Sequence, residues 1–313
     1  MARAPHPFDS PAPDDDALTG DDLHLALYLC YELHYRGLEG IDDRWEWEPS
    51  IITFRRSLEE CFERTLLDVV PTPPLAGDMA ETLQAVIDSD TGPSVADYMQ
   101  SRATLNEFKE FVIHRSAYHL KEADPHSWAI PRLEGRAKAA LVDIQSDEYG
   151  SGEHRRMHSR LFADLMDGLG LESAYGAYLS VVPGVTLASV NLMSLFGLNR
   201  RWRGAVVGHL AVFEMTSSVP NRKYANGLRR LGLHGCTDFF DEHVEADAVH
   251  AMIAAHDMAG ALAQDEPGIA RDIAFGANAL ITLDAAFARH VLAAWASGRS
   301  TLCRQGAMAN PPA

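Results

Sequence analysis

Apolar residues recur at helical spacing through almost the whole chain, and this pattern limits the fold more than any other feature. The segment over 23–38, LHLALYLCYELHYRGL, carries such a stripe and stops near Gly37 and Gly40. A second run over 52–69 ends at the sequence PTPP, which cannot continue a helix. Similar patterns predict helices over 79–90, 93–121, 134–148, 153–169, 172–182, 184–197, 201–216, 220–231, 236–263 and 267–297. The sequence therefore predicts an all-α protein.

Signals for other fold classes are scarce. No Asn-Gly or Asp-Gly turn separates two alternating β-branched runs, and no βαβ rhythm is present. The motifs GxGxxG, Walker A and GxSxG, which mark nucleotide sites and hydrolases, are absent. Composition shows no sharp boundary, so we expect a disordered lead-in over 1–18, one helical domain over 19–300 and a flexible tail over 301–313.

Charge and cysteine content exclude several classes of function. The net charge is −17, from 44 acidic against 27 basic residues, which repels nucleic acid and anionic membranes. The four cysteines form no CxxC pair, which argues against a disulfide framework and a zinc-thiolate site. No signal peptide is recognisable, and no stretch approaches 18 uncharged apolar residues. We therefore expect a cytoplasmic protein that acts on small molecules.

The sequence DEHVEADAVH, residues 241–250, places His243, Asp247 and His250 at positions i, i+4 and i+7. At helical spacing these side chains lie in one narrow stripe. Imidazole and carboxylate together suit iron, manganese or zinc. The alternative is a solvated acidic face, because several other acidic residues lie nearby.

Three further acidic positions are candidates for a metal site. Glu148 and His158 can share a metal only if the chain bends between them, and Gly150 and Gly152 permit such a bend. Glu214 is a lone carboxylate in an apolar helical run, where it is costly unless paired or coordinated.

Glu122 lies at a predicted helix end, and its i+4 partner would be His126. Because Asp124 precedes a proline, we expect this pairing to fail. The other histidines, including His119, His126, His256 and His290, are interpreted as packing or surface residues.

Together these motifs resemble the haem-oxygenase-like diiron oxidases, also called iron-containing redox enzymes. The likeness rests on KEADPHSWAIPRL, IQSDEYGSG with a downstream MH, HLAVFE and HVEADAVH, and on the N-terminal YELHYRGLEGIDDRWEW, so it covers about residues 20–297. It implies a haem-oxygenase-like helical bundle, with a seven-helix core and additional N-terminal helices. It also implies a non-haem diiron centre. The implied ligands are Glu122, Glu148 and His158 for one iron, with His243, Asp247, His250 and Glu214 completing the pair. His154 competes with His158, and only the family spacing favours the latter.

The resemblance further implies an oxygenase or oxidase in which two Fe(II) ions activate O2. Four carboxylates balance the charge of two Fe(II) ions, and no glutamate is followed three residues later by the histidine of a ferritin-like site. N-oxygenation of a small amine or amino-acid-like substrate is the leading prediction. Oxidative C–C cleavage, decarboxylation or desaturation of an amino or fatty acid is the alternative. An external electron donor and a homodimer are compatible with either reaction.

Two other classes remain open. One is a metal-free helical binding protein, and the other is a haem-handling protein with His24 or His34 as the axial ligand. A substrate carboxylate could be anchored by Arg222 and Lys223, although these are more simply interpreted as surface residues.

Overall fold

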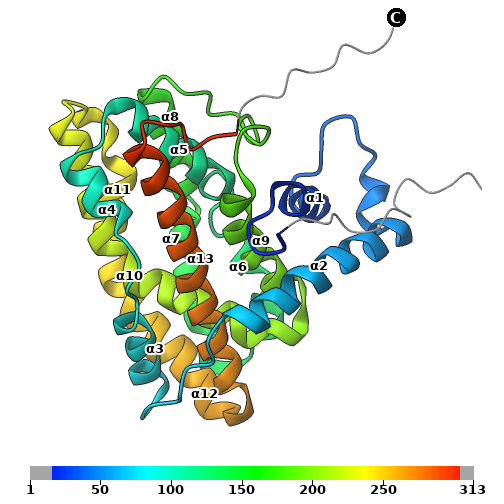
Figure 1. Ribbon diagram of the computed structural model, residues 1–313. Coiled ribbons are helices and arrows are strands. Elements are labelled where there is room, and N and C mark those ends of the chain that lie inside the picture. The colour runs from blue at the N-terminus through cyan, green and yellow to red at the C-terminus, as the bar shows by residue number, and fades with distance from the viewer. Residues whose placement is uncertain (1–15, 304–313) are drawn as a thin grey trace, which may run out of the picture.

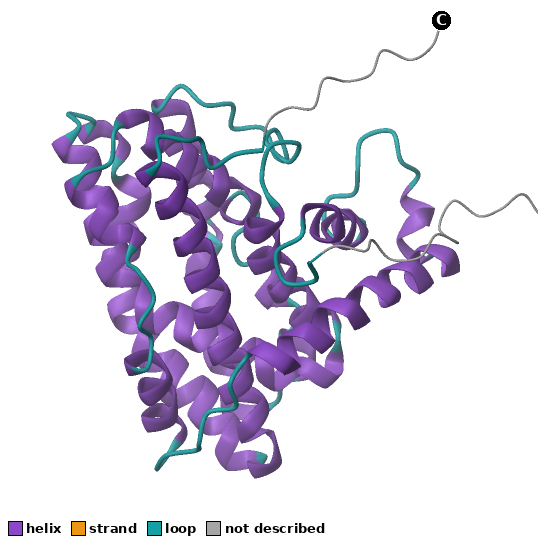
Figure 2. Ribbon diagram, viewed as in Figure 1, coloured by secondary structure: helices purple, strands orange, loops and turns teal. Residues whose placement is uncertain are grey.

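The computed structural model describes residues 16–303, and within this range every regular element is helical (Figures 1 and 2). The α-helices are α1 (Asp21–Glu32), α2 (Pro49–Val69), α3 (Met79–Asp88), α4 (Val95–Ser101), α5 (Leu105–His119), α6 (Asp124–Ser127), α7 (Gly135–Glu148), α8 (His158–Gly168), α9 (Gly184–Leu198), α10 (Arg203–Arg230), α11 (Asp238–Met252), α12 (Ala261–Asp265) and α13 (Ala270–Ala296). A π-helical segment, η7 (Ile253–Gly260), joins α11 to α12. Short 3-10 turns lie at η1 (Asp43–Trp47), η2 (Ile130–Arg132), η3 (Gly150–Gly152), η4 (His154–Arg156), η5 (Arg200–Trp202), η6 (His234–Cys236) and η8 (Pro267–Ile269). The prediction of an all-α fold is confirmed.

The two longest helices near the C-terminus, α10 and α13, form the centre of the bundle. Their backbones come close at two glycines: a Cβ on Gly208 would lie 1.8 Å from the Ile273 carbonyl oxygen, and one on Gly276 would lie 2.0 Å from that of Ala205. Any larger residue at either position would push the helices apart. On its other sides α10 packs against α11 and α4, so it reaches most of the core. Figure 1 shows α1 and α2 at one side of this bundle, where α1 packs on α9.

By length and composition alone, the helical segment Pro267–Ala296 could cross a membrane, which differs from the expectation that no stretch is apolar enough. In the described structure 44% of its most apolar window is buried inside the protein. Ile273, Leu283 and Val291 are among the side chains that it contributes to the core. Its apolar character is accounted for by its position as a core helix.

Several predicted helix boundaries were wrong. The helix expected over 93–121 is interrupted, because Thr104 caps α5 in a reciprocal capping box with Glu107. The segment expected as a helix over 172–182 forms turns instead, with Gly176 at φ 76°. Conversely, α10 runs unbroken through Pro220, joining the two helices expected over 201–216 and 220–231. Packing of both halves of α10 outweighs the single backbone hydrogen bond that proline removes.

The described parts of the expected terminal segments are folded. Residues 1–15 of the lead-in and 304–313 of the tail lie outside the described residues. Asp16 begins a turn in which its carboxylate accepts a hydrogen bond from the Leu18 backbone N–H. At the other end, Thr301 is 2% exposed and its hydroxyl bonds to the ring of His114. Both segments therefore make ordered contacts in the described structure, and the expected domain limits stay a prediction.

Candidate metal centre

Seven acidic and histidine side chains from five parts of the chain converge inside the bundle. None of them is more than 7% exposed. They form two groups, and the candidate ligand atoms of each lie within 4.8 Å of one another: Glu122, Glu148, His158 and His243 in one, and Glu148, Glu214, Asp247 and His250 in the other. Glu148 belongs to both groups, so one carboxylate links them. The division of the seven residues between two ions differs from the expected one in one respect: His243 lies with Glu122, Glu148 and His158.

Helix α11 presents its metal-type residues inward. His243, Asp247 and His250 are 2–4% exposed, whereas Glu245 on the other side of the helix is exposed. The solvated acidic face is therefore real but lies on a different side of α11. His243 Nδ1 lies 2.7 Å from the Phe239 carbonyl oxygen, four residues earlier. This bond turns Nε2 towards the centre and holds the ring in one orientation.

The turn between α7 and α8 brings Glu148 and His158 together. Gly150 and Gly152 have φ of 66° and 87°, so the chain bends where the sequence predicted. A Cβ on Gly150 would lie 2.6 Å from the Met157 backbone nitrogen, so this position has no room for a side chain. As a result His158 Nδ1 lies 2.8 Å from Glu148 Oε2. The competing His154 is exposed and takes no part in the cluster.

Glu122 follows α5 in a turn whose next residue, Ala123, has φ of 74°. His119 Nδ1 lies 2.8 Å from Glu122 Oε1, and His243 Nε2 lies 3.6 Å from the same oxygen. His126 does not pair with Glu122, as expected; its Nε2 lies 3.1 Å from His209 Nδ1. His119 packs against Phe162 and Phe239, as interpreted, but its contact with Glu122 was not predicted. The i, i+3 spacing from His119 to Glu122 in HLKE was the signal that could have found it.

Three contacts orient the remaining carboxylates and imidazole. Glu214, on α10, is 4% exposed, and its Oε2 lies 3.4 Å from His250 Nδ1. The Ser217 hydroxyl, nearly one turn further along α10, donates to Asp247. His250 Nε2 lies 3.2 Å from Asp147 Oδ2, outside the cluster. These outer contacts leave the His250 Nδ1 side facing the centre.

The protonation of the cluster is strongly coupled to its carboxylates. Burial lowers the pKa of His243, but contact with Glu122 outweighs burial and raises it to about 10. Burial likewise opposes the charge on His250, whereas Glu214 raises its pKa to about 9. Burial raises the pKa of Asp247 to about 6 and also raises that of Glu214. Without a metal the site therefore holds protons that a cation would displace.

The residues present fit a pair of metal ions. Among the described residues, Glu122 Oε2, His158 Nδ1 and His250 Nδ1 are buried and have no hydrogen-bond partner. The two imidazole nitrogens approach carboxylate oxygens, but not at the angle of a hydrogen bond. Buried polar atoms are costly unless paired, and cations placed among these atoms would satisfy them.

The candidate haem ligands and the candidate substrate anchors from the sequence lie outside the cluster. His24 Nε2 lies 3.0 Å from the Leu18 carbonyl oxygen, and His34 Nδ1 lies 3.2 Å from Glu46, so both rings are engaged away from the cluster. Lys223 pairs with Asp97 at 2.7 Å, and Arg222 is exposed. Haem ligation by His24 or His34 therefore gains no support from the geometry.

Comparison with known proteins places this chain in a family. The profile of the iron-containing redox enzymes matches residues 109–285, more than half of the chain and all seven clustered residues. The chain belongs to this family. The haem-oxygenase-like fold suggested by the sequence motifs is thereby confirmed, and the protein is an oxidoreductase of an iron-containing class.

One relative with a described activity is nitrosourea synthase from Streptomyces achromogenes subsp. streptozoticus. It is 28% identical to this chain over 184 residues. The matched region is 56% of this chain but only 39% of the relative. The relative is therefore a much longer protein, and the match covers a minor part of it.

Proposed function

We propose that the seven clustered side chains hold two iron ions and that the protein is an O2-dependent non-haem diiron oxygenase. The observation that carries the proposal is the sharing of Glu148 between two four-residue groups. Glu122, His158 and His243 would hold one ion, and Glu214, Asp247 and His250 the other. When bound, the ion pair supplies the electrons and the Lewis acidity that O2 reduction needs.

The residues around the cluster would control its surroundings. Phe239, through its carbonyl oxygen, and Ser217 fix the orientation of His243 and Asp247. Tyr118 and Phe213 line a small cavity of about 10 Å³ against the ligands, so bulk water is excluded there. Exclusion of water strengthens electrostatic interactions and limits side reactions. A larger pocket of about 280 Å³ reaches the cluster at His243 and gives a substrate a place to bind.

N-oxygenation of a small amine or amino-acid-like molecule is the reaction that we propose. The name of the relative, nitrosourea synthase, supports chemistry at nitrogen. Hydroxylation of an amine nitrogen by O2 forms one N–O bond and one water molecule, and it consumes two further electrons and two protons. An external electron donor would supply these electrons. Oxidative C–C cleavage, decarboxylation or desaturation by the same centre is the alternative outcome of the test.

The test supplies iron-loaded protein with O2, a reductant and a panel of amines and amino acids. Substrate-dependent O2 consumption, with a product that gains one labelled oxygen atom on nitrogen from isotopic O2, is the expected result. Release of CO2 or formation of an alkene would replace N-oxygenation by the alternative. Tight binding of a panel member without iron uptake would instead favour a metal-free binding protein.

A further inference from the structure

The pocket that reaches the metal cluster at His243 is also lined by charged side chains that lie away from the cluster. It runs from His243 and Ser217 to the loop between α3 and α4, where Asp90 and Ser94 are exposed. Aromatic rings form much of its wall, among them Phe162 and Phe240. At about 280 Å³ it is near the lower limit for ligand sites, so it suits a molecule of amino-acid size.

Arg115 lines this pocket from α5. It lies four residues before His119, so the two side chains share a helix face about 6 Å apart along the axis. The Arg115 guanidinium lies over two rings, 5.4 Å from the centre of Phe111 and 4.9 Å from that of Phe287. These rings hold the guanidinium in place, where it also interacts with the Tyr224 side chain, and its other N–H groups can donate to a ligand.

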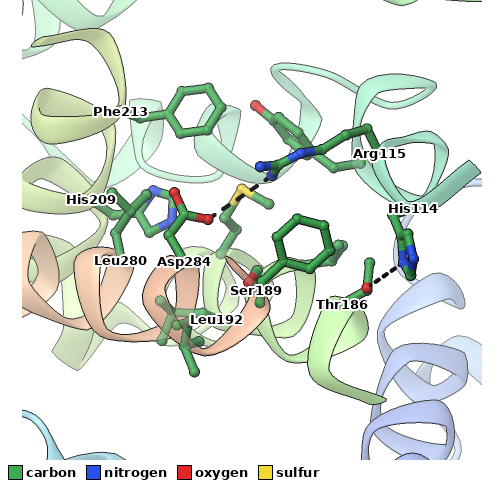
Figure 3. A pocket seen from close by; sticks show the side chains of 14 residues that line it. His114, Arg115, Thr186, Ser189, Leu192, His209, Phe213, Leu280 and Asp284 are labelled. Atoms are coloured by element: carbon green, nitrogen blue, oxygen red, sulfur yellow. Dashed lines mark hydrogen bonds and ion pairs between the residues drawn. The ribbon is translucent and has the colours of Figure 1, made fainter. Parts of the chain in front are cut away.

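Asp284, on α13, also lines this pocket, and Figure 3 shows it facing Arg115 among the residues that line a smaller cavity. Arg115 Nη1 and Asp284 Oδ1 are 4.0 Å apart, which is longer than a hydrogen bond. The Asp284 side chain keeps 48% of its surface accessible although burial raises its pKa. A small cavity of about 40 Å³ is also lined by both side chains.

The separation of these charges is poorly explained by packing alone. A structural ion pair between two such groups normally closes to hydrogen-bond distance, with the guanidinium fork on the carboxylate. Here both groups line the same pocket and remain accessible, so each can accept a further partner. An α-amino acid carries its ammonium and its carboxylate on one carbon atom, a spacing that matches a cation and an anion 4.0 Å apart.

We propose that Arg115 and Asp284 together bind the head group of an α-amino acid, whose side chain extends along the aromatic wall towards the metal centre. Arg115 takes the carboxylate and Asp284 takes the ammonium. The site of oxidation is then at the far end of the substrate's side chain rather than at its α-nitrogen. This inference rests on the proposed function and narrows its substrate class.

The test measures binding to iron(II)-loaded protein without O2, so that no turnover occurs. The standard L-α-amino acids are titrated one at a time by calorimetry. The tightest binder is then compared with its decarboxylated amine and with its deaminated acid. Loss of either charged group from the ligand is expected to weaken its binding to the wild-type protein by about 10- to 100-fold, because one charged hydrogen-bonding partner is lost.

Variants assign each effect to one side chain. The Arg115→Gln variant is expected to bind the amino acid and its decarboxylated amine with the same affinity, because the partner of the carboxylate is gone. The Asp284→Asn variant is likewise expected to bind the amino acid and its deaminated acid with the same affinity. Arg115→Lys should recover part of the affinity because it keeps the charge. Arg222→Gln, on the exposed face of α10, is the matched control and should leave all affinities unchanged.

Two results would overturn the inference. One is that no amino acid binds more tightly than both of its truncated analogues. The other is that Arg115→Gln weakens all three probes equally, which indicates a structural role. Iron content is measured on the same samples, so a failed head-group site with two irons per chain leaves the diiron proposal standing. If no iron binds, the same titrations on metal-free protein still decide the head-group question.

Discussion

Two sets of buried histidines in this protein differ in their electrostatics. His243 and His250 lie in the metal cluster, where carboxylates raise their pKa values to about 10 and about 9. His114 and His126 are equally inaccessible, but there burial outweighs the weaker influence of Glu110 and Glu122 and lowers their pKa values to about 3 and about 4. Burial lowers the pKa of His209 as well. Where burial dominates, the rings stay neutral, and the raised values of His243 and His250 come chiefly from contact with Glu122 and Glu214.

The difference indicates what each set can do. His114 Nδ1 and Nε2 lie 2.7 and 2.8 Å from the hydroxyls of Thr186 and Thr301, which is a satisfied structural arrangement. In the cluster, by contrast, His158 and His250 each keep a nitrogen without a hydrogen-bond partner in the described structure. A divalent cation can replace the protons there, whereas both ring nitrogens of His114 are already engaged by hydroxyl groups.

The largest expected effect comes from removing the shared carboxylate. Glu148→Gln keeps the size of the side chain but leaves both four-residue groups one charge short, so both irons should be lost. Iron per chain after anaerobic loading is the measurement. Asp143→Asn, on the exposed side of α7, is the control and should bind iron normally. Retention of one tightly held iron in Glu148→Gln would contradict the bridging position.

The next largest effect on iron binding can be measured on two nearby histidines, His158 and its control His154. His158→Ala removes a cluster member, and affinity for one iron should fall by more than about 100-fold, beyond the usual effect of an outer contact. His154→Ala, four residues earlier and exposed, should change nothing. Iron titration followed by dialysis separates the variants. Equal losses in both, or in neither, would remove His158 from the centre.

A smaller effect is expected for His119, which acts through Glu122. Its Nδ1 lies 2.8 Å from Glu122 Oε1, so His119→Ala should weaken iron binding by about 10- to 100-fold. His119→Gln, which can still donate a hydrogen bond, should recover much of this loss. A purely structural role would instead lower thermal stability in both variants without rescue of iron affinity.

The neutral histidines should produce the mildest effect, a dependence of stability on pH. The unfolded chain binds protons at His114 below pH about 6.5, while the folded chain resists protonation until about pH 3. Stability is therefore lost as pH falls through this window, by about 1.4 kcal/mol per pH unit for this residue. Asp247, with its pKa raised to about 6, works in the opposite direction in metal-free protein.

Comparison with a variant isolates the contribution of His114. Urea unfolding of metal-free wild type and His114→Gln at a series of pH values gives the two slopes. The free energy of unfolding of the variant should change with pH less steeply than that of wild type, by about 1.4 kcal/mol per pH unit, whatever the variant's absolute stability. His154→Gln should show the wild-type slope. An unchanged slope in His114→Gln would mean that His114 is protonated in the folded protein.

Local patterns in the sequence predicted much of the fold and of the cluster. The stripe of His243, Asp247 and His250 follows from helical geometry alone, and the bend at Gly150 follows from glycine chemistry. Helix continuity through Pro220 could not be predicted, because packing of α10 on distant helices decides it.

Contacts between distant residues were also beyond prediction from the sequence. Arg115 and Asp284 are separated by most of the chain, and nothing local marks either as a pocket residue. His119 was missed for another reason: its spacing to Glu122 was visible, but the orientation of its ring depends on the turn at Ala123. Local patterns identified candidates, the family resemblance implied the set of seven, and tertiary structure brings that set together.

The central claim is that this cluster holds two irons that react with O2. Anaerobic titration of the metal-free protein with Fe(II), followed by rapid mixing with O2, tests it most directly. The account predicts two irons per chain and a transient visible absorption band, both lost in Glu148→Gln and kept in Asp143→Asn. One iron per chain or none, with no transient on exposure to O2, would contradict it.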